Sequence, residues 1–205
     1  MNSRLDVRGR SSVNPRRGNR AVTGLVSGVC AALLVTGCGG DGQEADSVPG
    51  GWGTLKTKGV DVSYPKGSDG YVERGADERS EHNAAEAVRT EDGTIVSMIT
   101  VQLDFTDADS AEEAAIAAEA GVQLGATLKG EKDVQLAGTD EAKRVDFEFS
   151  STGEEDTPPK GTRLQGVILT GLDSREKTFA VRIDAKKGAL DDADLSKIID
   201  SVQVH

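Results

Sequence analysis

The chain has 205 residues, a formal net charge of −11 and 3% aromatic residues. Residues 1–37 hold six of its 24 Lys and Arg residues but one of its 35 Asp and Glu residues, which leaves 18 basic and 34 acidic residues, a net charge near −16, from residue 38 onward. Nucleic-acid phosphates and anionic lipid headgroups repel a domain this acidic, so we exclude nucleic-acid binding and attachment to a membrane through a basic face.

The N-terminal segment predicts a bacterial lipoprotein signal peptide over residues 1–37. Six arginines precede an uncharged stretch over residues 21–35, and small residues then lead to Gly37 and Cys38. That stretch, about 15 residues long, is shorter than the ~20 residues of a membrane-spanning helix. We expect cleavage after Gly37 and a diacylglycerol on the Cys38 thiol. An ordinary secretory signal and an uncleaved apolar segment stay as alternatives, and the choice between Sec and twin-arginine export is open.

Lipidation of Cys38 predicts a protein that is lipid-anchored in the cell membrane, at its extracytoplasmic face. Two acyl chains, at ~0.8 kcal/mol for each buried methylene, hold a protein stably where one chain is marginal. Cys30 is the other cysteine and would leave with the signal peptide, so we expect no disulfide and no thiolate metal site. Residues 38–50 predict a flexible tether of at most ~40 Å, and residues 51–205 a single domain.

The first half of this domain predicts strands. Alternating apolar residues favour a hairpin of strands 52–57 and 60–64, and Glu91-Asp92-Gly93 is a strong turn signal between a strand near 84–90 and a long strand over 94–105. The long strand is apolar on both sides, because Val96 and Met98 interrupt the alternation of Ile95, Ile99 and Val101 with polar residues. We therefore expect it to be central and covered on both faces.

The second half predicts two helices with strands between them. Ser110 and Glu113 form a capping-box signature for a helix reaching to about residue 124. Strands follow near 133–137, 141–150, 162–172 and 179–183. A closing helix over 192–201 carries apolar residues at i, i+3, i+4 and i+7, namely Leu195, Ile198, Ile199 and Val202. The predicted fold class is α+β, as an α/β/α sandwich with a helix on each face of a mainly antiparallel sheet.

Several of these segments together resemble the PsbP-like fold, which includes the LpqN-type lipoproteins of actinobacteria. The resemblance rests on Trp52 and the run Gly59-Val60-Asp61-Val62-Ser63-Tyr64-Pro65, the long hairpin to Phe105, the capped helix, the strands around Phe147 and over 162–172, and the closing Ile198-Ile199-Asp200-Ser201-Val202. It implies an α/β/α sandwich used for binding or assembly, and it supplies no catalytic residues that can be carried over. In this chain, residues 66–71 stand where the family usually has a Trp after the Tyr-Pro step.

No motif in the chain predicts catalysis. His82 is the only histidine within the domain body, and no nucleophile motif accompanies it, so we interpret it as a solvated loop residue. The carboxylates of Asp104, Asp107, Asp109 and Glu112 would suit Ca²⁺ as ligands, but their spacing lacks the glycine and distal glutamate of an EF-hand. Helix capping explains Asp107 and Asp109 more simply. We expect no catalytic residue, no metal and no cofactor.

Trp52, Tyr71 and His82 form the one ligand site that the sequence suggests, since aromatic residues close to a loop can line a small-molecule pocket. The alternative is that Trp52 and Tyr71 belong to the core, which needs aromatic residues in a chain with so few. The favoured hypothesis is a non-enzymatic binding or envelope-assembly module whose partner is an envelope protein or a small ligand. The competing hypothesis is an envelope hydrolase that uses His82 and nearby carboxylates.

Overall fold

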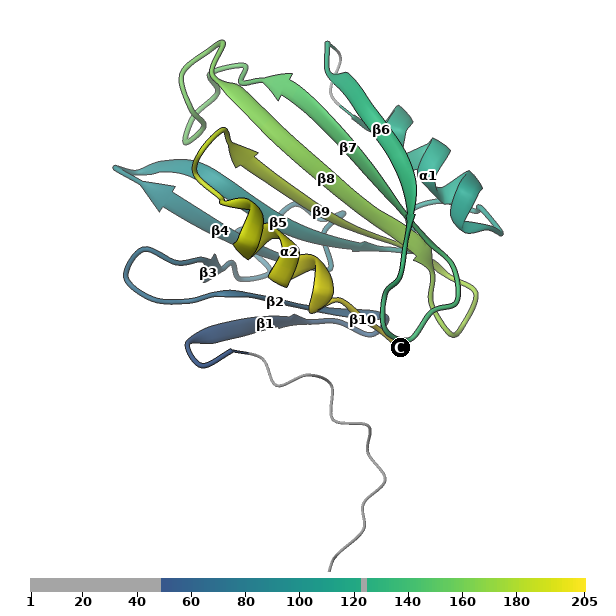
Figure 1. The fold of residues 1–205 in the computed structure, drawn as a ribbon. Coiled ribbons are helices and arrows are strands. Elements are labelled where there is room, and N and C mark those ends of the chain that lie inside the picture. Colours follow the sequence, from purple (N-terminus) through teal and green to yellow (C-terminus); the bar gives the residue numbers. More distant parts are fainter. Residues whose placement is uncertain (1–48, 123–124) are drawn as a thin grey trace, which may run out of the picture. The chain divides into compact units, whose positions relative to one another are not determined.

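Two sheets and two helices make up the part of the chain that the structure, a computed structural model, describes: residues 49–122 and 125–205 (Figure 1). The small sheet has the order β1-β2-β10, with β1 Trp52–Lys56, β2 Val60–Pro65 and β10 Gln203–Val204. The seven-stranded sheet has the order β3-β4-β5-β9-β8-β7-β6. Its strands are β3 Val72–Glu73, β4 Ala85–Glu91, β5 Thr94–Leu103, β6 Thr127–Val134, β7 Ala142–Ser150, β8 Arg163–Leu172 and β9 Thr178–Lys186. All strand pairs in both sheets are antiparallel.

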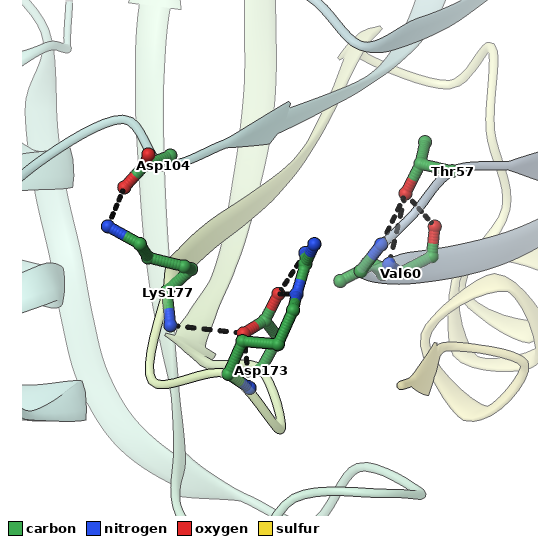
Figure 2. A network of polar contacts seen from close by, with 7 residues as sticks. Thr57, Val60, Asp104, Asp173 and Lys177 are labelled. Atoms are coloured by element: carbon green, nitrogen blue, oxygen red, sulfur yellow. Dashed lines mark hydrogen bonds and ion pairs between the residues drawn. The ribbon is translucent and has the colours of Figure 1, made fainter.

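Turn chemistry explains the two predicted hairpins, which the structure confirms. Between β1 and β2, the Oγ1 of Thr57 accepts a hydrogen bond from the N–H of Val60 at 3.0 Å (Figure 2). Asp61 Oδ1 accepts one from the Thr57 N–H at 3.1 Å. Between β4 and β5, Asp92 and Gly93 have φ angles of 51° and 78°. Two consecutive positive φ angles match the twist of the flanking strands in a tight hairpin.

Both helices begin at a capping side chain. Helix α1, Ala111–Ala120, starts where Ser110 Oγ accepts a hydrogen bond from the Glu113 N–H at 3.2 Å, which confirms Ser110 as the N-cap. Helix α2, Asp192–Asp200, starts where Asp191 Oδ1 accepts one from the Asp194 N–H at 2.7 Å. The buried residues of α1 are all alanine, so this helix can lie close to the sheet.

The hydrophobic core forms on both faces of the seven-stranded sheet, because successive side chains of a strand point to opposite faces. On one face, Ile99, Leu169 and Phe179 pack with side chains of the small sheet and α2. On the other face, β7, β8 and β9 pack with α1 through the cluster Ala115, Ala118, Val145, Phe147, Ile168 and Ala180. The two-sided burial predicted for residues 94–105 and 162–172 is therefore confirmed for β5 and β8.

The predicted α+β class is confirmed, but the sandwich with a helix on each face is wrong. Helix α1 does lie on one face, whereas the other is covered by a layer in which the small sheet and α2 lie together (Figure 1). The reason lies in residues 202–204. Val202 and Val204 are buried, and β10 pairs with β2, which places α2 against the small sheet.

Two further differences concern the edges of the seven-stranded sheet. Strand β6 spans Thr127–Val134, so the expected strand near 133–137 was placed too late. Every residue of β6 except Val134 is exposed, and a charged edge strand shows no apolar alternation in the sequence. The opposite edge, β3, has two residues and was not predicted. The predicted signal peptide, most of the tether, Gly37 and Cys38 lie outside the described residues.

Candidate functional site

The three residues of the predicted ligand site occupy different environments. Tyr71 is buried, and its hydroxyl oxygen lies 2.6 Å from Ser97 Oγ. Trp52 is half-buried and packs against the core below the small sheet. The side chain of His82 is 78% exposed, and its one charged contact within the described residues is Glu81, 3.8 Å away. Tyr71 lines one of the two clefts described next, whereas Trp52 and His82 line neither.

The first cleft, which we call the tyrosine cleft, has a volume of about 300 Å³ and lies between the loop of residues 65–70, Tyr71, Arg89 and the start of α2. The loop closes on itself, since the Tyr71 N–H donates to the Pro65 carbonyl at 2.8 Å. A Cβ on Gly70 would come within 2.6 Å of the Lys66 backbone, so this tight turn requires glycine there. The local sequence thus shapes one wall of the cleft.

Hydrogen bonds fix the other walls of the tyrosine cleft. Arg89 donates to the backbone carbonyl of Ala189 and, at 2.8 Å, to Glu91 Oε1, which ties β4 to the chain entering α2. Ser97 Oγ donates its only proton to the Asp184 carbonyl at 2.8 Å, so the Tyr71 hydroxyl must donate to Ser97. The hydroxyl therefore points into the core and leaves the aromatic ring as the part of Tyr71 that a ligand can touch.

The pKa of the Tyr71 hydroxyl lies above its usual value. Burial is the main cause, and the negative charge of Asp194 adds to it, while the hydrogen bond with Ser97 and the positive charge of Arg89 act in the opposite direction. Tyr71 is thus a neutral hydrogen-bond donor over the whole physiological range. It serves as a fixed wall of the tyrosine cleft.

The second cleft, which we call the strand cleft, has a volume of about 260 Å³ and lies over β7, β8 and β9 beside α2. Its floor is aliphatic, with Val167, Ile183 and Leu195 among its residues. The charged residues at its rim are Lys129, Arg144, Asp146, Glu148 and Asp192. This combination of an apolar floor and a polar rim is typical of sites for small ligands or side chains.

The two cations at the rim of the strand cleft are each paired with an anion. Arg144 Nη2 lies 2.6 Å from Asp146 Oδ1, and Lys129 Nζ lies 3.0 Å from Glu148 Oε2. Glu148 also accepts a hydrogen bond from Arg163 at 3.0 Å. The hydrogen bond from Lys129 is the main reason why the pKa of Glu148 lies below its usual value. The rim is therefore polar without a strong excess of either charge.

Leu190 joins the two clefts, because this buried residue lines both of them. Just after it, Asp192 lines the strand cleft and Asp194 lines the tyrosine cleft, both from the first turn of α2. The start of α2 is thus a ridge with a cleft on each side. Sequence patterns did not reveal this site, because its walls come from residues 65–71, 89, 129, 144–148, 165–167, 183–185 and 190–195.

Two of the four carboxylates considered as Ca²⁺ ligands form ion pairs in the structure. Asp104 pairs with Lys177 at 3.2 Å (Figure 2), and Glu112 pairs with Lys143 at 2.6 Å. Residues 49–122 and 125–205 contain no group of three or more His, Cys, Asp or Glu side chains arranged to hold a metal ion. Within the same residues, no helix has the length and apolar character needed to cross a bilayer.

Comparison of the chain with protein-family models and with curated proteins gave no match.

Proposed function

We propose that the protein is a lipid-anchored binding module at the extracytoplasmic face of the cell membrane, and that it binds its ligand at the start of α2. The anchor is supported by the signal-like layout of residues 1–37 and by the small residues before Cys38. The net charge near −16 from residue 38 onward gives the domain no electrostatic attraction to anionic lipids, so the acyl chains on Cys38 hold it at the membrane. Membership of the PsbP-like family stays a prediction.

The observation that carries the binding proposal is the pair of clefts on either side of Leu190. Small-molecule sites have volumes of roughly 300–1,000 Å³. The tyrosine cleft, at about 300 Å³, is at the lower limit of this range, and the strand cleft, at about 260 Å³, is slightly below it. Each cleft therefore accepts a small group, and a ligand that extends over the first turn of α2 fills both. Two side chains of an envelope protein or the two ends of one small molecule meet this description.

Metabolic labelling with a fatty acid tests the anchor. The native chain and the Cys30→Ala variant should incorporate the label, whereas Cys38→Ala should not, because Cys38 is the proposed acylation site. Cys30→Ala is the matched control, since it removes the only other thiol. Equal labelling of Cys38→Ala and the native chain would contradict the proposed anchor, and it would not bear on the proposed binding site.

Site-specific photo-crosslinking in intact cells tests the binding site. A photoreactive amino acid replaces Gln165 in the strand cleft or Ser68 in the tyrosine cleft, with the exposed loop residue Thr152, which lines neither cleft, as the control position. We expect the same adduct from positions 165 and 68 and no adduct from position 152. Equal adducts at all three positions, or none at positions 165 and 68, would refute the site.

A further inference from the structure

Asp184 is a buried carboxylate near the end of β9, two residues before Lys186, on the face of the seven-stranded sheet that α1 covers. Its cross-strand neighbours there are Met98 on β5 and Gly166 on β8. The side chain is 10% exposed, and Oδ1 has no hydrogen-bond partner among the described residues. A buried ionised oxygen without a donor is costly, since nothing replaces the water that it loses on folding.

Arg182 donates a hydrogen bond to one of the two oxygens of this carboxylate. Its Nε donates to Asp184 Oδ2 at 2.8 Å, which is a single bond where a two-pronged arginine–carboxylate pair would make two. The guanidinium lies 5.0 Å from the ring centre of Phe147 and 5.8 Å from that of Phe149. Arg182 is therefore held on the aromatic rings as well as on Asp184, and it leaves Oδ1 without a bond.

The space beside Oδ1 is filled by protein atoms. A Cβ placed on Gly166 would meet Phe147 Cζ at 2.2 Å and Asp184 Oδ1 at 2.6 Å, so ring and carboxylate together fill the volume above the glycine. On the Gly166 side, no room is left for a bridging water, which needs a polar space of about one water diameter. The aromatic edge carries partial positive charge, which is a weak substitute for an N–H donor.

Other charged groups of this face have partners of their own. Glu86 on β4 pairs with Arg74 at 3.4 Å, and Lys186 on β9 lies 3.8 Å from Glu91. Lys143 on β7 contacts three carboxylates, among them Glu112 of α1 at 2.6 Å, and the sheet-facing residues of α1 are alanines. On β5 and β8 the cross-strand neighbours of Asp184 and Arg182 carry no charge. Within residues 49–122 and 125–205, Arg182 is thus the one charge that offsets the burial of Asp184.

We propose that Asp184 and Arg182 form a protonation-controlled latch between the seven-stranded sheet and α1. Protonation of Asp184 stabilises the packing of α1 on this face of the sheet, and loss of the proton destabilises it. Protonation removes the charge for which Oδ1 has no donor, so the native packing of Phe147 against Ala115 and Ala118 gains stability. The latch does not depend on the lipid anchor or on either cleft. It makes the rigidity of the α1 face respond to mild acidity.

The pH range of the latch follows from the position of the carboxyl group. Burial raises the pKa of Asp184 to about 6, and the attraction and hydrogen bond of Arg182 limit the increase. In the unfolded chain the same group titrates near 3.9. Because the folded pKa is the higher one, the folded state binds the proton more tightly, and the contribution to stability is complete below about pH 4 and is lost as the pH rises through about 6.

Amide hydrogen exchange on the full chain in detergent micelles tests the latch. After correction for intrinsic rates, protection of α1 and β9 amides should be roughly 50-fold higher at pH 4 than at pH 7, as expected from a difference of about two pKa units when the unfolded group is about half-protonated at pH 4. Asp184→Asn should abolish this difference. Asp173→Asn is the matched control, because it changes a buried aspartate at the end of β8 and should retain the pH dependence of the α1 amides.

A direct titration covers the case in which Asp184→Asn does not fold. The carboxyl ¹³C signal of Asp184 in the native chain should titrate near pH 6, and Arg182→Gln should move its midpoint upward, because the offsetting charge is gone. A midpoint near 4 in the native chain, or equal protection of α1 at pH 4 and pH 7, would overturn the proposal.

Discussion

Asp173 and Asp184 are two buried aspartates at the two ends of one hairpin, and their surroundings have opposite effects. Burial disfavours the charge of Asp173, but hydrogen bonds from the Arg175 side chain and from the N–H groups of Lys177 and Arg175 outweigh it, and its pKa lies below the usual value. Figure 2 shows this arrangement at the β8–β9 turn. At Asp184, burial prevails, and its pKa rises to about 6.

The difference lies in where each residue stands in the hairpin. At the turn, the N–H groups of residues 175 and 177 are not part of a strand ladder and can point at the carboxylate of Asp173. Around Asp184, within β9, the neighbouring N–H groups are engaged in ladders with β5 and β8, so only a side chain can donate to this carboxylate. For these two aspartates, the direction of the pKa shift thus depends more on the number of N–H groups free to donate to the carboxylate than on how deeply it is buried.

Asp173→Ala should have the largest effect, because Asp173 is the aspartate whose carboxylate accepts several hydrogen bonds. The side chain is 1% exposed, and its loss leaves the N–H groups of Arg175 and Lys177 without their acceptor. We expect a loss of about 3 kcal/mol in the free energy of unfolding. Urea denaturation at pH 7 measures it, with the exposed Ser174→Ala as control. A loss no larger than that of the control would contradict the role given to Asp173.

Gly166→Ala should crowd Asp184, the aspartate whose Oδ1 lacks a hydrogen-bond donor among the described residues. The new methyl group would overlap Phe147 and Asp184 Oδ1, so the sheet must shift to accept it. Overpacking of this kind costs about 2 kcal/mol in the free energy of unfolding. Gly50→Ala is the control, since nothing lies within 4 Å of its added Cβ. Equal stability of Gly166→Ala and the native chain would show that the space beside Oδ1 is open.

Asp184→Asn should stabilise the protein at pH 7 by roughly 1–2 kcal/mol, because the amide imitates the protonated acid while its own N–H groups lack acceptors. The gain should shrink as the pH falls from 7 to 4, where the native Asp184 takes up its proton. Denaturation of both chains over this pH range measures the difference. A gain that is the same at pH 4 and pH 7 would mean that Asp184 does not titrate between them.

Arg175→Gln should have the smallest effect and sharpens the explanation of Asp173. The Arg175 side chain is 52% exposed, so solvent screens its ion pair with Asp173. We expect a loss of about 0.5 kcal/mol in the free energy of unfolding at pH 7, measured by urea denaturation. If Arg175→Gln cost as much as Asp173→Ala, the side chain, and not the backbone N–H groups, would hold the charge of Asp173.

Local chemistry made much of the fold predictable. Ser110 and Glu113 indicated the start of α1, Asp92-Gly93 the β4–β5 turn, and alternating residues the two faces of β7. Strand β6 was misplaced because it lies at a sheet edge with charged residues on both sides. The layer of α2 and the small sheet was missed because it depends on the pairing of β10 with β2, which are far apart in the sequence.

The candidate sites were much less predictable. Tyr71, an aromatic residue beside a loop, lines the tyrosine cleft, but its role in ligand binding stays a prediction, and the clefts also need Leu190 and the first turn of α2. Asp184 alternates with Val181 and Ile183 as a solvent-facing residue would, so the sequence suggests that it is exposed. It is buried because α1 and Phe147 cover that face too, and alternation within a single strand does not show what lies on its polar side.

The pairing of β10 with β2 also determines when this domain can fold. Gln203 and Val204 pair with Asp61 and Val60, and Ser201 Oγ accepts a hydrogen bond from the Ser63 N–H across 138 positions of the chain. Contacts over such distances close late and slowly, because the entropy of a long loop must be lost before they form. During synthesis, the small sheet therefore stays incomplete until residues 201–204 have been made, and β2 keeps a free edge for all of that time.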